Sequence, residues 1–193
     1  SQIVPLPIQS PLLMTDEPLV TVCLPSHQDL LGDKLTAFAP HTTGIPFFKG
    51  QKMCTMEIIK QLFDIASLFD ITDNLSVTRQ TFLKFAKVEL QYRNLPSDDI
   101  QQVLDDIYQT SITICMRGGE KPEEYKLLQD GISRIGNFIH SEKYTLDSAI
   151  INAAKVAYLS RLLEKGINEI RHYTPNDIGE LASQNLQLPM PTK

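Results

Sequence analysis

The stretch MEIIKQLFDIASLFDI, residues 56–71, decides the fold that the rest of the chain is expected to adopt. Its large apolar residues recur at intervals of three and four, so they line one stripe of an α-helix. The members of that stripe are Ile58, Leu62, Ile65 and Phe69. The other side of the helix is charged and carries Glu57, Lys60 and Asp64, with Lys60 and Asp64 at the spacing of an ion pair. Such a helix is stable when its apolar stripe packs against other helices.

Further helical patterns surround this stretch. The first begins at Ser26, whose spacing to Asp29 is typical of a helix cap, and it should end near Phe38. The others are predicted over residues 76–94, 98–116, 122–140, 146–166 and about 175–184, with Ser97, Pro122 and Thr145 at three of the starts. Short connections between amphipathic helices predict a mainly α fold, a bundle of six to seven helices.

Residues 1–25 differ from the rest of the chain. They hold five of the twelve prolines, and residues 18–25, PLVTVCLP, have the β-branched composition of a strand. Proline at both ends indicates an edge strand or one that stops early. Because a lone strand leaves its backbone unpaired, we expect partner strands from outside this stretch. The expected architecture is therefore a helical bundle with a short N-terminal β-strand or hairpin.

The bulk composition is that of a globular chain and excludes several functional classes. The 193 residues are 42% hydrophobic and 21% charged, with a formal net charge of −5, so a broadly basic nucleic-acid-binding surface is not indicated. No apolar run reaches the roughly 18 residues that span a bilayer, and no secretory signal is visible. The cysteines and histidines are scattered without zinc-site spacing. The composition predicts a cytoplasmic protein with reduced thiols, no metal site and no membrane contact.

Lys34 is the first candidate site residue. At about 100° per residue it falls in the middle of an apolar arc. That arc is formed by Leu30, Leu31, Leu35, Ala37 and Phe38. A lysine in this place either lays its stem over apolar surface while its ammonium reaches solvent, or holds that cation at the mouth of a site for a phosphate or carboxylate. Helix geometry alone leaves both alternatives open.

The loop that follows, PHTTGIPFFKGQ at residues 40–51, adds further candidates. Thr42 and Thr43 can present hydroxyl and backbone N–H groups to a phosphate; alternatively, the loop ends the helix and packs its phenylalanines on the bundle. His41 is a candidate general base, although the sequence shows no partner for it.

Three other groups of residues are open to interpretation. Arg79, Lys84, Lys87 and Arg93, with Tyr92 among them, form either a solvated helix face or a surface on which RNA bases stack. The aspartate pairs at 98–99 and 105–106 are interpreted as surface charge and as negative charge that complements a helix N-terminus, since neighbours on a helix point about 100° apart. The residues predicted to lie in the core of the last long helix are Ile150, Ile151, Tyr158 and Leu162.

Two motifs together resemble a known family. LLGDKLTAFAPHTTGIPF at residues 31–48 and KQLFDI at residues 60–65 look like the C-terminal half of the AbiEii/AbiGii-type nucleotidyltransferase toxin family, bacterial proteins of the DNA polymerase β-like superfamily. That family has a helix with an lxeKlxAl lysine, a loop, an RDlyDl helix and a helical domain. The lysine corresponds to Lys34, the arginine place is taken by Lys60, and the second aspartate corresponds to Asp64. Gln61 replaces the first aspartate.

The resemblance implies a site and a chemistry. Lys34 would contact nucleotide phosphate, Thr42, Thr43 and Lys60 would also face the nucleotide, and Asp64 would position the lysine or the acceptor. The reaction would transfer a nucleotidyl group from an NTP to an RNA such as a tRNA end, or to a protein hydroxyl, with release of pyrophosphate. Mg²⁺ would neutralise the triphosphate. The biological setting would be a toxin–antitoxin or abortive-infection system.

The family's catalytic motif is not found in these residues. In the family, a glycine-containing loop lets the backbone approach the phosphates and the aspartates of an S-x-D-x-D motif hold Mg²⁺; neither motif occurs in the sequence. We therefore expect residues 1–50 to be a remnant of the nucleotidyltransferase core and residues 51–193 to be its helical C-terminal domain, inactive alone and without a cofactor of its own. The alternative is a non-catalytic helical interaction module that binds a partner protein such as an antitoxin.

Overall fold

Six helices account for most of the structure, as the apolar spacing predicted. The computed structural model describes residues 3–9, 14, 18–139 and 143–172. The helices in this part are α1 (His27–Ala37), α2 (Thr55–Phe69), α3 (Ser76–Tyr92), α4 (Ile100–Cys115), α5 (Pro122–Ile135) and α6 (Leu146–Glu164). The mainly α helical bundle is confirmed. The short helix predicted at about 175–184 lies outside the described residues.

Local capping chemistry sets the helix starts. The Ser26 hydroxyl accepts the backbone N–H of Asp29 at the start of α1, and Thr145 and Ser148 form a reciprocal capping box at the start of α6. Pro122 is the first residue of α5, where its missing N–H costs no helical hydrogen bond. The predicted cap at Ser97 is wrong: Asp99 caps α4, because its carboxylate accepts the N–H of Gln102.

A single hydrophobic core joins all six helices. The stripe predicted for residues 56–71 is buried, with Ile58, Leu62 and Ile65 fully enclosed and Phe69 nearly so. This stripe places α2 against α1, α5 and α6, while α4 packs along α6 and α1 crosses α3. Leu35 of α1 belongs to the same core, so the helix with Lys34 is part of the bundle. A domain division at residue 50 stays a prediction.

Two of the four residues predicted for the core of α6 lie at the surface. Ile151 is 58% exposed and Tyr158 is 37% exposed, whereas Leu162 is buried and Ile150 packs against the edge of the core. The helix turns small residues such as Ala149 toward its neighbours. Close packing of α6 with α4 selects this face, so the larger Ile151 and Tyr158 are left outside.

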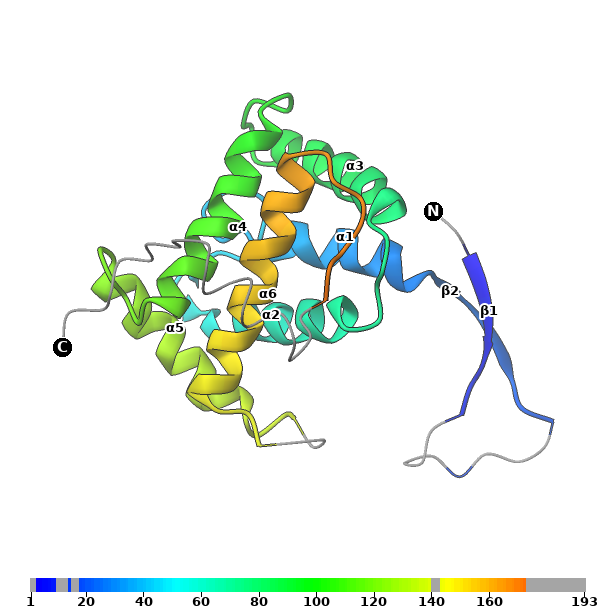
Figure 1. Ribbon diagram of the computed structural model, residues 1–193. Helices are drawn as coiled ribbons and strands as arrows, with labels where there is room; N and C mark the ends of the chain where they lie inside the picture. The colour runs from blue at the N-terminus through cyan, green and yellow to red at the C-terminus, as the bar shows by residue number, and fades with distance from the viewer. Residues whose placement is uncertain (1–2, 10–13, 15–17, 140–142, 173–193) are drawn as a thin grey trace, which may run out of the picture.

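The N-terminal strand has a partner inside residues 1–25. β1 (Ile3–Pro7) and β2 (Thr21–Pro25) form an antiparallel hairpin that projects from the bundle beside the start of α1 (Figure 1). The short N-terminal hairpin is therefore confirmed, whereas the expectation that partner strands come from outside this stretch is wrong. Prolines are tolerated in β1 because they occupy positions whose N–H would face away from the neighbouring strand. A second, two-residue pair begins in the predicted loop with β3 (Phe48–Lys49) and ends just after it with β4 (Lys52–Met53).

The structure also bears on membrane contact. No helix among the described residues has both the length and the apolar composition needed to cross a bilayer.

Candidate functional site

The lysine and aspartate of the two sequence motifs meet on neighbouring helices. Lys34 on α1 and Asp64 on α2 form an ion pair with 3.0 Å between Nζ and Oδ2, and each side chain is 26% exposed. The flanking residues Leu31 and Leu35 are fully buried, so the stem of Lys34 lies over the core while its ammonium stays near the surface. Packing of α1 on α2 thus joins residues about thirty positions apart in the sequence.

Lys60 does not take part in this contact. Its side chain is exposed on α2, and Asp64 is paired with Lys34 instead of the residue one turn earlier. The modest Lys60–Asp64 ion pair suggested by their spacing is therefore not formed. Glu57 on the same helix pairs with Lys52, 3.0 Å away, at the end of the small hairpin. Glu57 and Lys60 thus lie on the solvated side of α2, as predicted.

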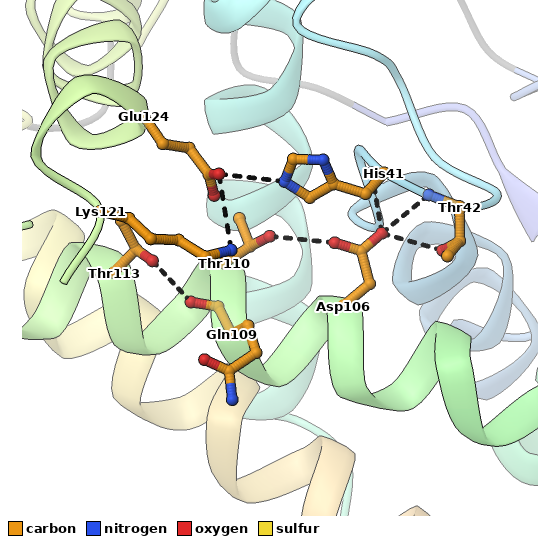
Figure 2. A network of polar contacts seen from close by, with 8 residues as sticks. All are labelled: His41, Thr42, Asp106, Gln109, Thr110, Thr113, Lys121 and Glu124. Carbon is orange, nitrogen blue, oxygen red and sulfur yellow. Dashed lines mark hydrogen bonds and ion pairs between the residues drawn. The ribbon is translucent and has the colours of Figure 1, made fainter.

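The loop after α1 is held by a buried carboxylate. Asp106 of α4 is 7% exposed, and its Oδ2 accepts three hydrogen bonds from the loop (Figure 2). The donors are the His41 N–H at 2.8 Å, the Thr42 N–H at 2.9 Å and the Thr42 hydroxyl at 2.8 Å. The Thr110 hydroxyl reaches the other oxygen at 3.4 Å. Asp106 therefore fixes the loop on α4, and a phosphate at Thr42 would have to displace this carboxylate.

The other loop threonine is also used internally. The Thr43 hydroxyl donates to the Thr36 carbonyl at 2.8 Å and its side chain is buried. Arg93, just after α3, donates from one guanidinium nitrogen to the carbonyls of Thr43 and Gly44. These contacts close the loop from both sides, so neither threonine hydroxyl is oriented toward solvent.

His41 lies at the outer end of the Asp106 network and has a partner that the sequence did not reveal. Its Nε2 lies 3.1 Å from Glu124 Oε2 on α5, and Lys121 Nζ is 3.5 Å from the same oxygen (Figure 2). The hydrogen bond to Glu124 raises the pKa of His41 above its usual value, against the opposing effect of burial. The loop is thereby tied to α5 as well as to α4.

The pKa values of the two carboxylates in this network, Asp106 and Glu124, are shifted in opposite directions. Burial raises the pKa of Asp106, and the hydrogen bonds from Thr42 and His41 reduce that effect without cancelling it. Burial also acts to raise the pKa of Glu124, but the hydrogen bond and charge of His41, together with the charge of Lys121, outweigh it and lower that pKa. Glu124 Oε1 is buried and has no hydrogen-bond partner, so only one oxygen of this carboxylate is used.

A cavity lies beside the loop and is lined by Thr43, Gly44 and Ile45. Its volume is about 260 Å³, and its walls come from the C-terminal half of α1, the loop and α3. The charged lining residues are Asp33, Lys49, Glu89 and Arg93, and Phe85 supplies an aromatic wall. Neither this cavity nor a second one of about 250 Å³ beside the Lys155–Asp70 ion pair includes Lys34 or Asp64. The candidate lysine–aspartate pair thus lies outside these two cavities, with each side chain about one quarter exposed.

The basic helix face seen in the sequence is partly folded inward. Arg79 donates to the carbonyls of Leu162 and Ile167 at 3.2 and 3.4 Å, where it covers the end of α6. Arg93 is bound to the loop as described. Lys84 and Lys87 remain exposed, so the four cations do not form one continuous stripe.

Magnesium, which the family resemblance implies, has no group of ligands in this part of the chain. Among the residues with a described structure, no three histidine, cysteine, aspartate or glutamate side chains gather closely enough to hold a metal ion. Asp64 stands alone beside Lys34, and Asp106 is occupied by N–H and O–H donors. The described residues therefore do not fit the metal-holding part of such a site.

Sequence reasoning missed the residues that organise the loop. Asp106 was assigned to the surface together with Asp105, although it lies three positions after Val103 and four before Thr110, on the buried side of α4. This spacing was a usable signal. The contacts of Glu124 with His41 and of Arg93 with the loop join residues at least 49 positions apart, and no local pattern indicates them.

Comparisons with known proteins add no relative. No family model, no curated protein and no solved structure matches this chain.

Proposed function

We propose that this chain carries the lysine–aspartate part of a nucleotidyltransferase of the AbiEii/AbiGii type, and that Lys34 binds a nucleotide phosphate. The observation that supports this proposal is the 3.0 Å contact between Lys34 and Asp64, the two residues that the motifs single out. Both side chains are about one quarter exposed, so an incoming phosphate can reach the ammonium without unfolding the helices. Asp64 would hold the lysine in place until the phosphate takes over the contact.

The chemistry proposed for the whole enzyme is transfer of a nucleotidyl group to an RNA or protein acceptor. The role assigned to this chain is limited to binding and orientation: Lys34 offers a cation, and Asp64 fixes its position. We also propose that the whole enzyme binds an NTP and the acceptor, and that it has an antitoxin as a partner. Magnesium ligands would have to come from residues other than those described.

Nucleotide binding by the chain itself tests the proposal. We expect a fluorescent ATP or GTP analogue to bind the wild-type protein, and Lys34→Ala to weaken binding by about tenfold, the effect of one charged hydrogen bond. Lys84→Ala, which removes an exposed lysine on α3, is the matched control and should bind as the wild type does. Equal binding by the wild type and Lys34→Ala would contradict the role of Lys34.

A transfer assay tests the second part. Incubation of the chain with labelled NTPs, Mg²⁺ and RNA should give no label transfer above background, since the metal-binding motif is not among these residues. Robust transfer would show that the catalytic carboxylates have been assigned incorrectly.

The alternative function is a non-catalytic helical interaction module. It is favoured by the internal use of both loop threonines, whose hydroxyls are bound to Asp106 and to the Thr36 carbonyl. In that case Lys34 and Asp64 are a structural ion pair, and neither wild type nor variant binds nucleotide. The binding experiment therefore separates the two candidates.

A further inference from the structure

The N-terminal hairpin has one face made entirely of aliphatic side chains. Opposite residues of an antiparallel pair share a face, and the register alternates along both strands. The pairs on this face are Val4 with Leu24, Leu6 with Val22, and Ile8 with Val20. Val20 is 66% exposed, Leu6 46% and Leu24 42%, so the bundle leaves much of the face uncovered. Two strands alone are marginally stable in water, and such a face favours a larger sheet.

The outer edge of β1 cannot accept another strand in the usual way. The Ile8 N–H donates to the Val20 carbonyl at 2.8 Å, which fixes the residues of β1 that face β2 as 4, 6 and 8. Pro5 and Pro7 alternate with them and point their backbone nitrogens away from β2. A proline nitrogen has no hydrogen to donate, so this edge is blocked at two successive outward positions.

The outer edge of β2 is open. Thr21 and Cys23 lie opposite Pro7 and Pro5, so their N–H and C=O groups point away from β1. Within the described part of the chain, no strand pairs with this side of β2. The hairpin thus has one blocked edge and one edge that presents two N–H donors with their carbonyls.

We propose that β2 pairs antiparallel with β2 of a second copy of this chain, which gives a four-stranded sheet in the order β1-β2-β2-β1. Residues 3–8 and 18–25 contain no charged side chain, so two identical edges meet without like-charge repulsion. A two-fold axis uses the same edge from both copies, and the proline-blocked β1 strands then form both outer edges. The assembly therefore closes at a dimer. This inference is independent of nucleotidyl transfer.

The alternation fixes the register of the joint. With the two-fold axis at Val22, Thr21 lies opposite Cys23 of the second copy, and these outward-facing residues exchange hydrogen bonds across the joint. Val22 then lies opposite Val22 of the second copy. The two form a pair without hydrogen bonds, in which Cα atoms are about 4.5 Å apart. Val20 comes opposite Leu24 of the second copy, so the aliphatic face continues across all four strands.

Molar mass and one edge substitution test the dimer. Light scattering should give twice the 21.8 kDa of one chain over a range of concentrations. Cys23→Pro copies on β2 the arrangement that Pro5 has on β1: it removes an outward N–H without touching the bonds to β1, and should yield a folded monomer. Cys23→Ala keeps the N–H and should stay dimeric. A monomeric wild type overturns the proposal, and so does one whose β2 edge binds a strand of another polypeptide or of a longer form of this chain. A Cys23→Pro protein that stays dimeric and retains the wild-type circular dichroism also overturns it.

Disulfide cross-linking tests the register. In a Cys23→Ser background, Val22→Cys should form a disulfide between copies under mild oxidation, since about 4.5 Å between Cα atoms suits a disulfide. Leu6→Cys in the same background is the matched control: it lies on the same face but on β1, separated from its counterpart by two strands, and should not cross-link. Cross-linking at residue 6 and not at residue 22 would show that the copies meet in another way.

Discussion

Asp106, which the sequence placed at the surface, fixes the loop after α1 on α4. A buried carboxylate is unfavourable unless donors surround it, and three loop donors converge on its Oδ2. Its neighbour Asp105 lies at the surface near Arg161, 3.6 Å away. The same residue type at adjacent positions thus has opposite roles, because 100° of helix rotation separates the two side chains.

Replacement of Asp106 should destabilise the fold. Asp106→Ala leaves the His41 N–H, the Thr42 N–H and the Thr42 hydroxyl unpaired, and we expect a loss of about 2 to 4 kcal/mol of unfolding free energy in urea titrations. Asp105→Ala is the matched control and should change stability by less than about 0.5 kcal/mol, as exposed pairs do. Equal stability of the two variants would show that the loop does not depend on the carboxylate.

The His41–Glu124 pair should make stability depend on pH. The pKa of His41 is raised, so its contribution is complete below the unfolded value of 6.5 and disappears as pH rises through the higher folded value. The pKa of Glu124 is lowered, so its contribution is present above its unfolded value of 4.5 and disappears as pH falls through the lower folded value. Asp106, with a raised pKa, contributes in the opposite sense and reduces stability as pH rises above 3.8.

A comparison with His41→Gln isolates the pair. Wild type should exceed this variant in unfolding free energy between about pH 4.5 and 6.5, by less than about 1 kcal/mol because the histidine is half exposed, and the difference should shrink above that range. Glu124→Gln should lose the same unfolding free energy over this pH range as His41→Gln does. The double variant should be little less stable than either single variant. A difference between wild type and His41→Gln that does not vary with pH would contradict this assignment.

At the scale of elements, helix starts could be predicted and helix contacts could not. Ser26, Pro122 and Thr145 were found because a cap is a local arrangement within a few residues. The targets of Arg79 and Arg93 lie far away in the sequence. The packing of α3 on α1 brings Arg93 to the loop, and the tertiary fold brings Arg79 to the end of α6 and the segment after it. The two-residue strands β3 and β4 are too short to show a periodic pattern.

The crossing of α1 over α3 depends on the absence of a side chain at Gly32. A Cβ there would lie 2.6 Å from the Thr78 carbonyl oxygen and 2.9 Å from the Phe82 nitrogen, both backbone atoms of α3. Gly32→Ala should therefore cost about 1 to 3 kcal/mol through overpacking, although alanine is the better helix former. The variant should also weaken nucleotide binding if Lys34 binds phosphate, because α1 would be displaced.

Gly136 provides the control for this substitution. It has φ −54° at the end of α5, and a Cβ there would have nothing within 4 Å. Gly136→Ala should be neutral or should stabilise by up to about 1 kcal/mol, since it restricts the unfolded chain. Thermal unfolding of the two variants measures the difference. A Gly32→Ala protein as stable as Gly136→Ala would show that the two helices separate easily.

At the scale of the whole molecule, apolar spacing predicted the bundle and composition predicted the strand at residues 18–25, whereas the position of that strand's partner was not predicted. Each helix carries its own stripe, so the sum of local patterns predicted a shared core. β1 has prolines at alternate positions. Prolines argue against a strand unless it is known which edge of β1 faces β2. The ion pair of Lys34 with Asp64 lies between these cases: the motifs named both residues, and the packing of α1 on α2 brought them together.

Hydrogen exchange should show the hairpin and the bundle as separate units of stability. Amides of buried residues on α4 and α6, such as Ile107 and Leu159, should exchange only by global unfolding, because these helices pack along each other in the core. In protein diluted below the concentration at which the dimer dissociates, the Val22 amide should exchange much faster, since two strands that project from the bundle can open without it. Equal protection of Val22 and Ile107 would mean that the hairpin is bound more tightly to the bundle than its few contacts indicate. Raising the concentration should then slow exchange at Thr21 and Cys23, whose N–H groups face away from β1. The Leu127 amide should show no such slowing, because α5 lies on the side of the bundle opposite the hairpin (Figure 1). Protection that appears at the outward amides alone would identify the edge of β2, and not the aliphatic face, as the place where association begins.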